Sequence, residues 1–111
     1  MFDGIAVRVP VICGSISDIT AVLKTNVTVD QVNNSFKKAQ DEEKFKGVLK
    51  YSDEPLVSSD IIGLPYSAIV DGLMTHVVAG NFVKVLAWYD NEWGYSSRLV
   101  DMAILLFKNI N

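Results

Sequence analysis

Two β-prone runs separated by a pair of turn formers constrain the fold of this chain more than any other feature. Residues 67–78 are rich in apolar side chains, and residues 82–88 form a second run of strand-favouring side chains. Gly80 and Asn81 lie between the two runs, and turn-forming dipeptides in that position are typical of a β-hairpin. The sequence therefore predicts a hairpin whose first arm is one long or bent strand.

Two further segments near the N-terminus show the period of two that is typical of strands. Apolar residues alternate with other residues over 5–11, which predicts a strand with one buried face and Arg8 on the other face. A similar alternation over 18–24 predicts a second strand. A turn between them would make the two strands antiparallel neighbours.

A capping box predicts the best-defined helix of the chain. Thr28 is placed to accept a hydrogen bond from the third helical amide, and Gln31 is placed to reach back to the cap. Val32, Phe36 and Ala39 follow at helical spacing. We therefore expect an amphipathic helix of about three turns.

Two short segments between the helix and the hairpin are predicted to be extended. Residues 48–51 have the composition of a strand. Residues 56–62 lie between Pro55 and Gly63, which favours a short extended piece beside a loop.

From Asn91 onward the pattern becomes helical, with apolar residues on two faces. One stripe consists of Leu99, Met102, Leu106 and Ile110, and the other consists of Val100, Ala103 and Phe107. Such a helix is expected to be covered on both sides, which one domain of 111 residues does not easily provide. The elements together predict a single α+β domain, with a mostly antiparallel or mixed sheet, helices on one face and a C-terminal helix.

Composition excludes several classes of function. Ten basic and 13 acidic residues without a long basic run give no nucleic-acid footprint. The longest apolar run, residues 102–107, is far too short for a membrane span. A single cysteine excludes an internal disulfide and a cysteine-based metal cluster, and it fits a reducing compartment, so a cytoplasmic location is expected.

Cys13 and His76 are the first residues to consider for catalysis. Cys13 has no histidine or other base close in sequence, so a packed cysteine is favoured over a nucleophile. His76 is surrounded by apolar neighbours in a predicted strand, which favours a structural role over a direct catalytic one.

Arg8 and the segment 88–96 are better candidates for a site. Arg8 either forms a structural ion pair, which its spacing favours, or faces an anion such as phosphate. Segment 88–96 sets four polar residues among four large aromatics at a strand-to-helix junction. Either Asp90 or Asn91 caps the helix, or an amide there faces a planar ligand between aromatic walls. The residues alone leave these two interpretations even.

Segment 88–96 is also where a family resemblance becomes visible. The run Trp-Tyr-Asp-Asn-Glu-Trp-Gly-Tyr-Ser, followed by Arg-Leu-Val-Asp at 98–101, resembles the C-terminal signature of the phosphorylating glyceraldehyde-3-phosphate dehydrogenases. Residues 3–11, 57–63 and 81–85 are similar to that family in the same order. The resemblance covers essentially the whole chain.

The resemblance implies an enzyme that converts glyceraldehyde 3-phosphate, phosphate and NAD to 1,3-bisphosphoglycerate and NADH. It implies that Arg8 contacts phosphate groups, that Asn91 holds the nicotinamide carboxamide of NAD, and that Tyr95 lies close to the nicotinamide. The resemblance assigns no catalytic residue and no metal ligand to this chain. The nucleophilic cysteine and the catalytic histidine of the family lie upstream of this segment, and neither Cys13 nor His76 matches them.

The resemblance further implies that residues 1–111 form the C-terminal part of the catalytic domain. Its final helix would pack on an NAD-binding domain outside the chain. The isolated chain is then expected to be inactive and to form a homo-oligomer, without nucleic-acid or membrane partners. Two alternatives are a non-catalytic interaction or oligomerisation module and a related erythrose-4-phosphate dehydrogenase. NAD cannot be distinguished from NADP, because the ribose-reading residues belong to the other domain.

Overall fold

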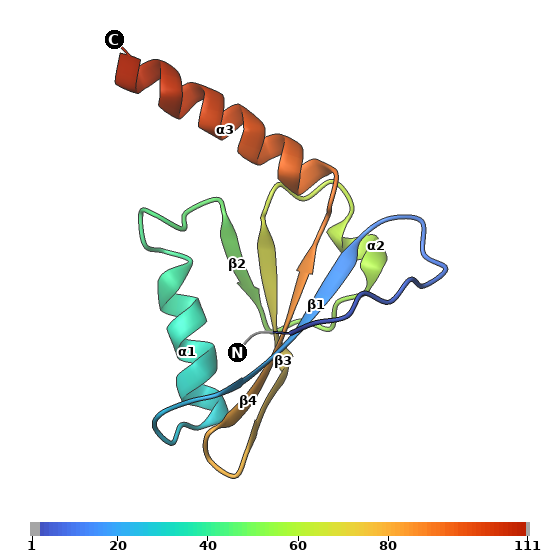
Figure 1. Cartoon of the computed structure of the whole chain (residues 1–111), viewed down its shortest axis with the longest axis vertical. Coiled ribbons are helices and arrows are strands. Elements are labelled where there is room, and N and C mark those ends of the chain that lie inside the picture. The colour runs from blue at the N-terminus through green and yellow to red at the C-terminus, as the bar shows by residue number, and fades with distance from the viewer. Residues whose placement is uncertain (1–2, 111) are drawn as a thin grey trace.

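Seven helices and strands follow one another along residues 3–110, the part of the chain that the computed structural model describes. In chain order they are β1 (Ser15–Val22), α1 (Val29–Ala39), β2 (Leu49–Ser52), α2 (Ser58–Ile61), β3 (Ala68–Val78), β4 (Phe82–Tyr89) and α3 (Trp93–Ile110). The strands form one sheet in the order β1-β4-β3-β2. β4 is antiparallel to both of its neighbours, and β2 is parallel to β3 (Figure 1). This mixed sheet with its helices confirms the predicted α+β class.

The predicted hairpin lies at the centre of the sheet. Residues 79–81 connect β3 to β4, since Val78 pairs with Phe82, and φ is positive at Ala79 (51°) and Gly80 (78°). β3 is also bent as predicted, because its pairing with β4 shifts register between Asp71 and His76. The hairpin and its irregular first arm are therefore both confirmed.

Helix α1 covers one face of the sheet and closes the core. Its capping box is formed: the Gln31 amide donates to Thr28 Oγ1 at 3.2 Å, and the Thr28 amide donates to Gln31 Oε1 at 2.9 Å. The core of the sheet consists of Val70, Val83 and Val85. Several half-buried apolar residues pack against it, namely Leu23, Val27, Val32, Phe36, Leu49, Tyr51 and Val77. Burial of this helix face accounts for the amphipathic pattern of the sequence.

Helix α3 extends away from the sheet, and its C-terminal end lies far from the other elements (Figure 1). Every residue from Leu99 to Ile110 is exposed, so both predicted apolar stripes are uncovered. Leu106, for example, is 55% exposed and Met102 is 55% exposed. None of the described helices is both long enough and apolar enough to cross a membrane.

The prediction of a strand over residues 5–11 is wrong. The segment has no regular structure and all of its residues are exposed, including Ile5 (93%) and Val7 (75%). An alternating pattern forms a strand only when a neighbouring strand accepts its hydrogen bonds, and Pro10 has no amide to donate. β1, which was expected to pair with this segment, pairs with β4 instead.

The prediction of an extended piece over residues 56–62 is also wrong, because part of it forms the short helix α2. The Val57 amide donates to Asp60 Oδ2 at 2.8 Å, and the Asp60 amide donates to the Val57 carbonyl at 3.0 Å. This turn places Ile61 in a fully buried position. Local hydrogen bonds and the burial of one large side chain therefore outweigh the weak extended signal.

The capping box offers a direct test of the α1 assignment. Thr28→Ala removes the acceptor for the Gln31 amide, and we expect it to lower the free energy of unfolding by about 1 kcal/mol. Urea denaturation followed by circular dichroism measures the change. Asn34→Ala, at an exposed position of the same helix, is the matched control and should change stability by less than about 0.5 kcal/mol. Equal effects of both substitutions would contradict the role of the cap.

Candidate functional site

The junction between β4 and α3 is organised by the buried carboxylate of Asp90, which is only 4% exposed. Asp90 Oδ1 accepts hydrogen bonds from the amides of Glu92 (3.0 Å) and Trp93 (2.8 Å), so Asp90 caps the start of α3. Its other oxygen, Oδ2, accepts from the Gly63 amide at 2.9 Å. One side chain therefore joins the end of β4, the first turn of α3 and the loop after α2.

These hydrogen bonds also set the charge state of Asp90. The bond from the Gly63 amide is the largest cause that lowers the pKa of the carboxyl, and the bond from the Trp93 amide comes next. Burial opposes them. Hydrogen bonds to the charged form favour that form, so Asp90 is a carboxylate at neutral pH.

Because Asp90 supplies the cap, the side chain of Asn91 is not used for capping. Asn91 is exposed, and its Oδ1 accepts a hydrogen bond from Ser15 Oγ at 3.3 Å. Asn91 and Tyr95 line the same hollow of about 300 Å³. The other lining residues are Ser67, Tyr89, Asp90, Gly94 and Arg98. Two of the three predicted site residues are thus brought together at one surface.

Close backbone contact holds the first turn of α3 beside this hollow. Gly94 is buried, and a Cβ added to it would lie 2.8 Å from the carbonyl oxygen of Tyr66. Arg98 lies one turn further on, where it donates to the Gly47 carbonyl (3.1 Å) and pairs with Asp101 (2.7 Å). The i,i+3 spacing of Arg98 and Asp101 was a usable sequence signal, whereas the contact with residue 47 was not.

Cys13 meets the same junction through a long-range hydrogen bond. Its thiol donates to Glu92 Oε2 at 3.1 Å, across 79 positions of sequence. This bond is the largest cause that raises the pKa of the thiol, followed by burial. A thiol that stays protonated is a poor nucleophile, so this hydrogen bond disfavours a nucleophilic role for Cys13.

The ligand atoms of Cys13, Asp90 and Glu92 lie within 4.8 Å of one another. The hydrogen bonds described above account for this arrangement, because both oxygens of Asp90 already accept from backbone amides. No sequence spacing indicated the cluster, since its first member is far from the other two.

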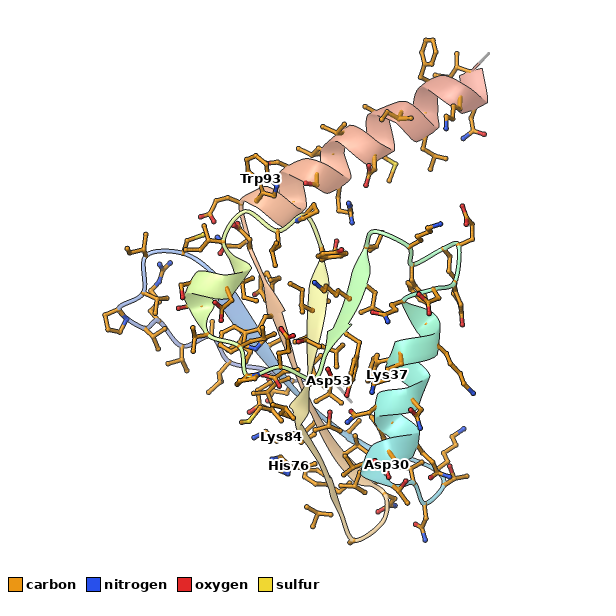
Figure 2. All side chains as sticks on the ribbon, turned by 180° about the vertical axis from the view of Figure 1, so that it is seen from behind. Asp30, Lys37, Asp53, His76, Lys84 and Trp93 are labelled. Atoms are coloured by element: carbon orange, nitrogen blue, oxygen red, sulfur yellow. The ribbon has the colours of Figure 1, made fainter. Side chains whose placement is uncertain are left out.

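Arg8 and His76 lie apart from the hollow. Arg8 is exposed on the irregular N-terminal segment, and none of the ion pairs found within residues 3–110 includes it. His76 is exposed on β3, where it pairs in register with Lys84. Figure 2 shows His76 and Lys84 close to each other on the sheet, away from Trp93 at the start of α3. His76 therefore takes no part in the junction.

The sheet and the junction define an α+β domain that presents an amide and a phenol ring to one shallow hollow. Comparison with known proteins assigns this domain. A model of the glyceraldehyde 3-phosphate dehydrogenase C-terminal domain matches residues 1–91. The chain is 52% identical over 104 residues to a glyceraldehyde-3-phosphate dehydrogenase of Streptomyces coelicolor, and 56% identical over 99 residues to glyceraldehyde-3-phosphate dehydrogenase 2 of Bacillus subtilis.

This chain belongs to the glyceraldehyde-3-phosphate dehydrogenase family and corresponds to its C-terminal domain. The two matches cover 94% and 89% of the chain, but only 31% and 29% of the relatives. The chain thus spans about a third of the length of the curated relatives that it matches. The predicted family is confirmed, and so is the match to its C-terminal part.

The lowered pKa of Asp90 yields a pH prediction. The folded-state pKa lies below the unfolded-state value of about 4, so the stabilisation by Asp90 is complete above pH 4–5 and is lost as pH falls through the folded-state pKa. Asp90→Asn removes this charge, and we expect a loss of about 1–3 kcal/mol at pH 7.

The free energy of unfolding, measured by urea denaturation between pH 7 and pH 3, tests this. The difference in the free energy of unfolding between the natural chain and Asp90→Asn should decrease below pH 4–5. Asp41→Asn, which changes an exposed carboxylate, should leave stability nearly unchanged at pH 7. A difference in unfolding free energy that stays constant down to pH 3 would contradict the lowered pKa of Asp90.

Proposed function

We propose that this chain supplies the nicotinamide-facing part of an NAD-dependent phosphorylating aldehyde dehydrogenase. The full enzyme would oxidise glyceraldehyde 3-phosphate in the presence of inorganic phosphate to give 1,3-bisphosphoglycerate and NADH. Membership in the family supports the reaction class. Within this chain, the observation that carries the proposal is the position of Asn91 beside Tyr95 in one hollow.

Asn91 is suited to bind a carboxamide. Ser15 donates to its Oδ1, which restrains the amide, and the exposed side chain also offers Nδ2 as a donor. A primary amide can pair with another primary amide through one donor and one acceptor. The carboxamide of a nicotinamide ring offers that complement, so the residues present fit the group. NAD, when bound, supplies the acceptor for the hydride; Asn91 would hold the ring in one orientation.

Tyr95 and Asp90 support Asn91 in different ways. Tyr95 is 65% exposed at the edge of the hollow, where its ring can lie beside a planar ligand. Asp90 acts as a positioning residue, because it accepts from the two amides that follow Asn91 and from the Gly63 amide, which ties this segment to the loop after α2. This rigid junction limits the freedom of Asn91 before a ligand arrives, which reduces the entropy cost of binding.

Arg8 is proposed to bind the phosphate groups of the substrate. Its guanidinium is exposed and has no ion-pair partner among the described residues, and a planar fork of donors suits phosphate oxygens. The segment that carries Arg8 is held to the junction at Cys13, through the hydrogen bond to Glu92. That tether supports the proposal, because Arg8 precedes Cys13 by only five residues in the sequence.

The nucleophile and the general base are proposed to come from chain outside these residues. The Cys13 thiol is kept protonated by Glu92, and His76 lies on another part of the sheet. The isolated chain should therefore be inactive. In the full enzyme we expect a homo-oligomer in the cytoplasm, with α3 packed on the NAD-binding domain.

The uncovered helix α3 favours one further candidate function. Its exposed apolar residues, such as Leu99 and Val100, could allow the isolated chain to act as an interaction module without chemistry. Mixing the chain with an intact relative and recording native mass spectra would reveal such hetero-oligomers.

Activity of the isolated chain is the first test. We expect no NADH formation above background from glyceraldehyde 3-phosphate, NAD and phosphate, measured at 340 nm. A chimera in which residues 1–111 replace the matching part of the Streptomyces coelicolor relative should be active, because the two sequences are 52% identical there. Turnover by the isolated chain that persists in Cys13→Ser would contradict the proposal. Erythrose 4-phosphate in the same assay tests the related substrate.

The roles of Asn91 and Arg8 are separable in that chimera. Asn91→Ala removes the proposed amide pair, and we expect kcat/KM for NAD to fall about 10- to 100-fold, equivalent to about 1.4–2.8 kcal/mol. Arg8→Leu should instead raise KM for phosphate or the aldehyde, with little change in KM for NAD. Asn34→Ala, on the exposed side of α1, is the control. Identical kinetic effects of the Asn91 and Arg8 variants would rule out the two separate roles.

A further inference from the structure

Residues 13–15 make two side-chain contacts with the junction between β4 and α3. The Cys13 thiol donates to Glu92 Oε2 at 3.1 Å, and the Ser15 hydroxyl donates to Asn91 Oδ1 at 3.3 Å. The two donors are two residues apart in the chain, and their acceptors belong to consecutive residues. One short segment therefore holds both the proposed nicotinamide-binding residue and the residue after it.

The sheet places the Ser15 hydroxyl at a defined position beside Asn91. Ser15 is the first residue of β1, and it pairs in register with Tyr89, the last residue of β4. Asn91 follows Tyr89 by two positions, so the pairing of β1 with β4 brings donor and acceptor together. The hydrogen-bond donor to Asn91 is therefore held by the strand ladder rather than by a loop.

Gly14 allows the chain to turn between the two donors. Its φ of 90° lies in a region that residues with a Cβ rarely adopt. A Cβ at this position would also lie only 3.3 Å from the carbonyl oxygen of Ser58 in α2. The close approach of residues 13–15 to the junction therefore favours glycine between Cys13 and Ser15.

We propose that residues 13–15 form a second support for the nicotinamide site, in which Ser15 is a positioning residue for the Asn91 amide. This inference rests on the proposed function of Asn91. An amide oxygen has two lone pairs, so Asn91 Oδ1 can accept from Ser15 and still accept from the carboxamide of a nicotinamide ring. A side chain that is already held loses less rotamer freedom when a ligand binds, which favours binding. Ser15 acts on the ligand only through Asn91.

The chemistry of a hydroxyl limits what Ser15 does. A hydroxyl can donate or accept, so it can bond to either end of a primary amide. Ser15 therefore restrains the position of the Asn91 amide and does not select which end of it meets the ligand. Loss of the hydroxyl should weaken the use of the cofactor without abolishing it.

Cys13 has the smaller part in this support. A thiol is a weak donor, and its bond to Glu92 holds the residue after Asn91 rather than Asn91 itself. Cys13→Ala removes the donor, and we expect it to lower kcat/KM for NAD less than Ser15→Ala does. Cys13→Ser keeps a donor and should lie closer to the natural sequence. A larger loss with Cys13→Ala than with Ser15→Ala would overturn this division of roles.

Kinetics of the active chimera test the role of Ser15. We expect Ser15→Ala to lower kcat/KM for NAD about three- to tenfold, the effect of one modest hydrogen bond. Ser15→Thr keeps the hydroxyl and should stay within about twofold of the natural sequence. Ser17→Ala, two residues further along β1, is the matched control and should also stay within about twofold. Equal losses with Ser15→Ala and Ser15→Thr, or no loss with Ser15→Ala, would overturn the proposal.

A double-mutant cycle separates positioning from a general structural effect. In an Asn91→Ala background, Ser15→Ala should change kcat/KM for NAD less than twofold, because its effect passes through Asn91. A further loss as large as in the natural background would overturn the proposal. If Asn91→Ala alone has no effect, the proposed function of Asn91 fails, and this inference fails with it. If Asn91→Ala lowers kcat/KM and Ser15→Ala does not, only this inference fails.

Nuclear magnetic resonance of the isolated chain tests the contact without catalysis. The order parameter of the Asn91 side-chain amide should fall in Ser15→Ala and stay unchanged in Ser17→Ala. The side-chain amide of Asn34, at an exposed position of α1, is an internal control in the same spectra. An order parameter of Asn91 that Ser15→Ala leaves unchanged would overturn the proposal.

Discussion

The buried carboxylate of Asp90 is the interaction on which the arrangement of this domain depends. It accepts three backbone hydrogen bonds, from two amides at the start of α3 and one in the loop after α2. The two amides at the start of α3 would otherwise have to find another acceptor where the chain changes from strand to helix, and the third bond ties this point to the loop after α2. Asp90 thus fixes the direction of α3, and it leaves the side chain of the next residue, Asn91, available for a ligand.

Most of the fold could be predicted because its signals are local. The Thr28 capping box, the hairpin around Gly80 and the start of a helix after Asn91 each depend on residues within a few positions of one another. The failures have a different origin. Residues 5–11 have a strand pattern but no partner strand within residues 3–110, and a pattern cannot specify which neighbour is present. Residues 56–62 form a helical turn that depends on burial of Ile61, a tertiary effect.

In the candidate site, too, the local features could be predicted and the long-range contacts could not. Asn91 lies just before α3 and Tyr95 lies in its first turn, so a single local motif was enough to indicate both. The contacts that organise them were not predictable, because Ser15 meets Asn91 across 76 positions and Cys13 meets Glu92 across 79. The sequence alone could not decide whether Asn91 caps the helix or binds a ligand through its amide. The geometry assigns the cap to Asp90, and this removes the simplest structural explanation for Asn91.

Within residues 3–110, the apolar residues of α3 and the outer edge of β1 are both uncovered, and the two surfaces require different kinds of partner. The apolar residues of α3 can be covered by any apolar surface of suitable shape, because hydrophobic burial is not directional. The open edge of β1 needs an extended strand with matching amides and carbonyls, because backbone hydrogen bonds require a defined distance and angle. Pairing at β1 is therefore restricted to registers in which the outward-directed backbone groups of the two strands meet. Of the two surfaces, the polar edge is the one that can specify a unique partner geometry, even though α3 exposes more apolar residues.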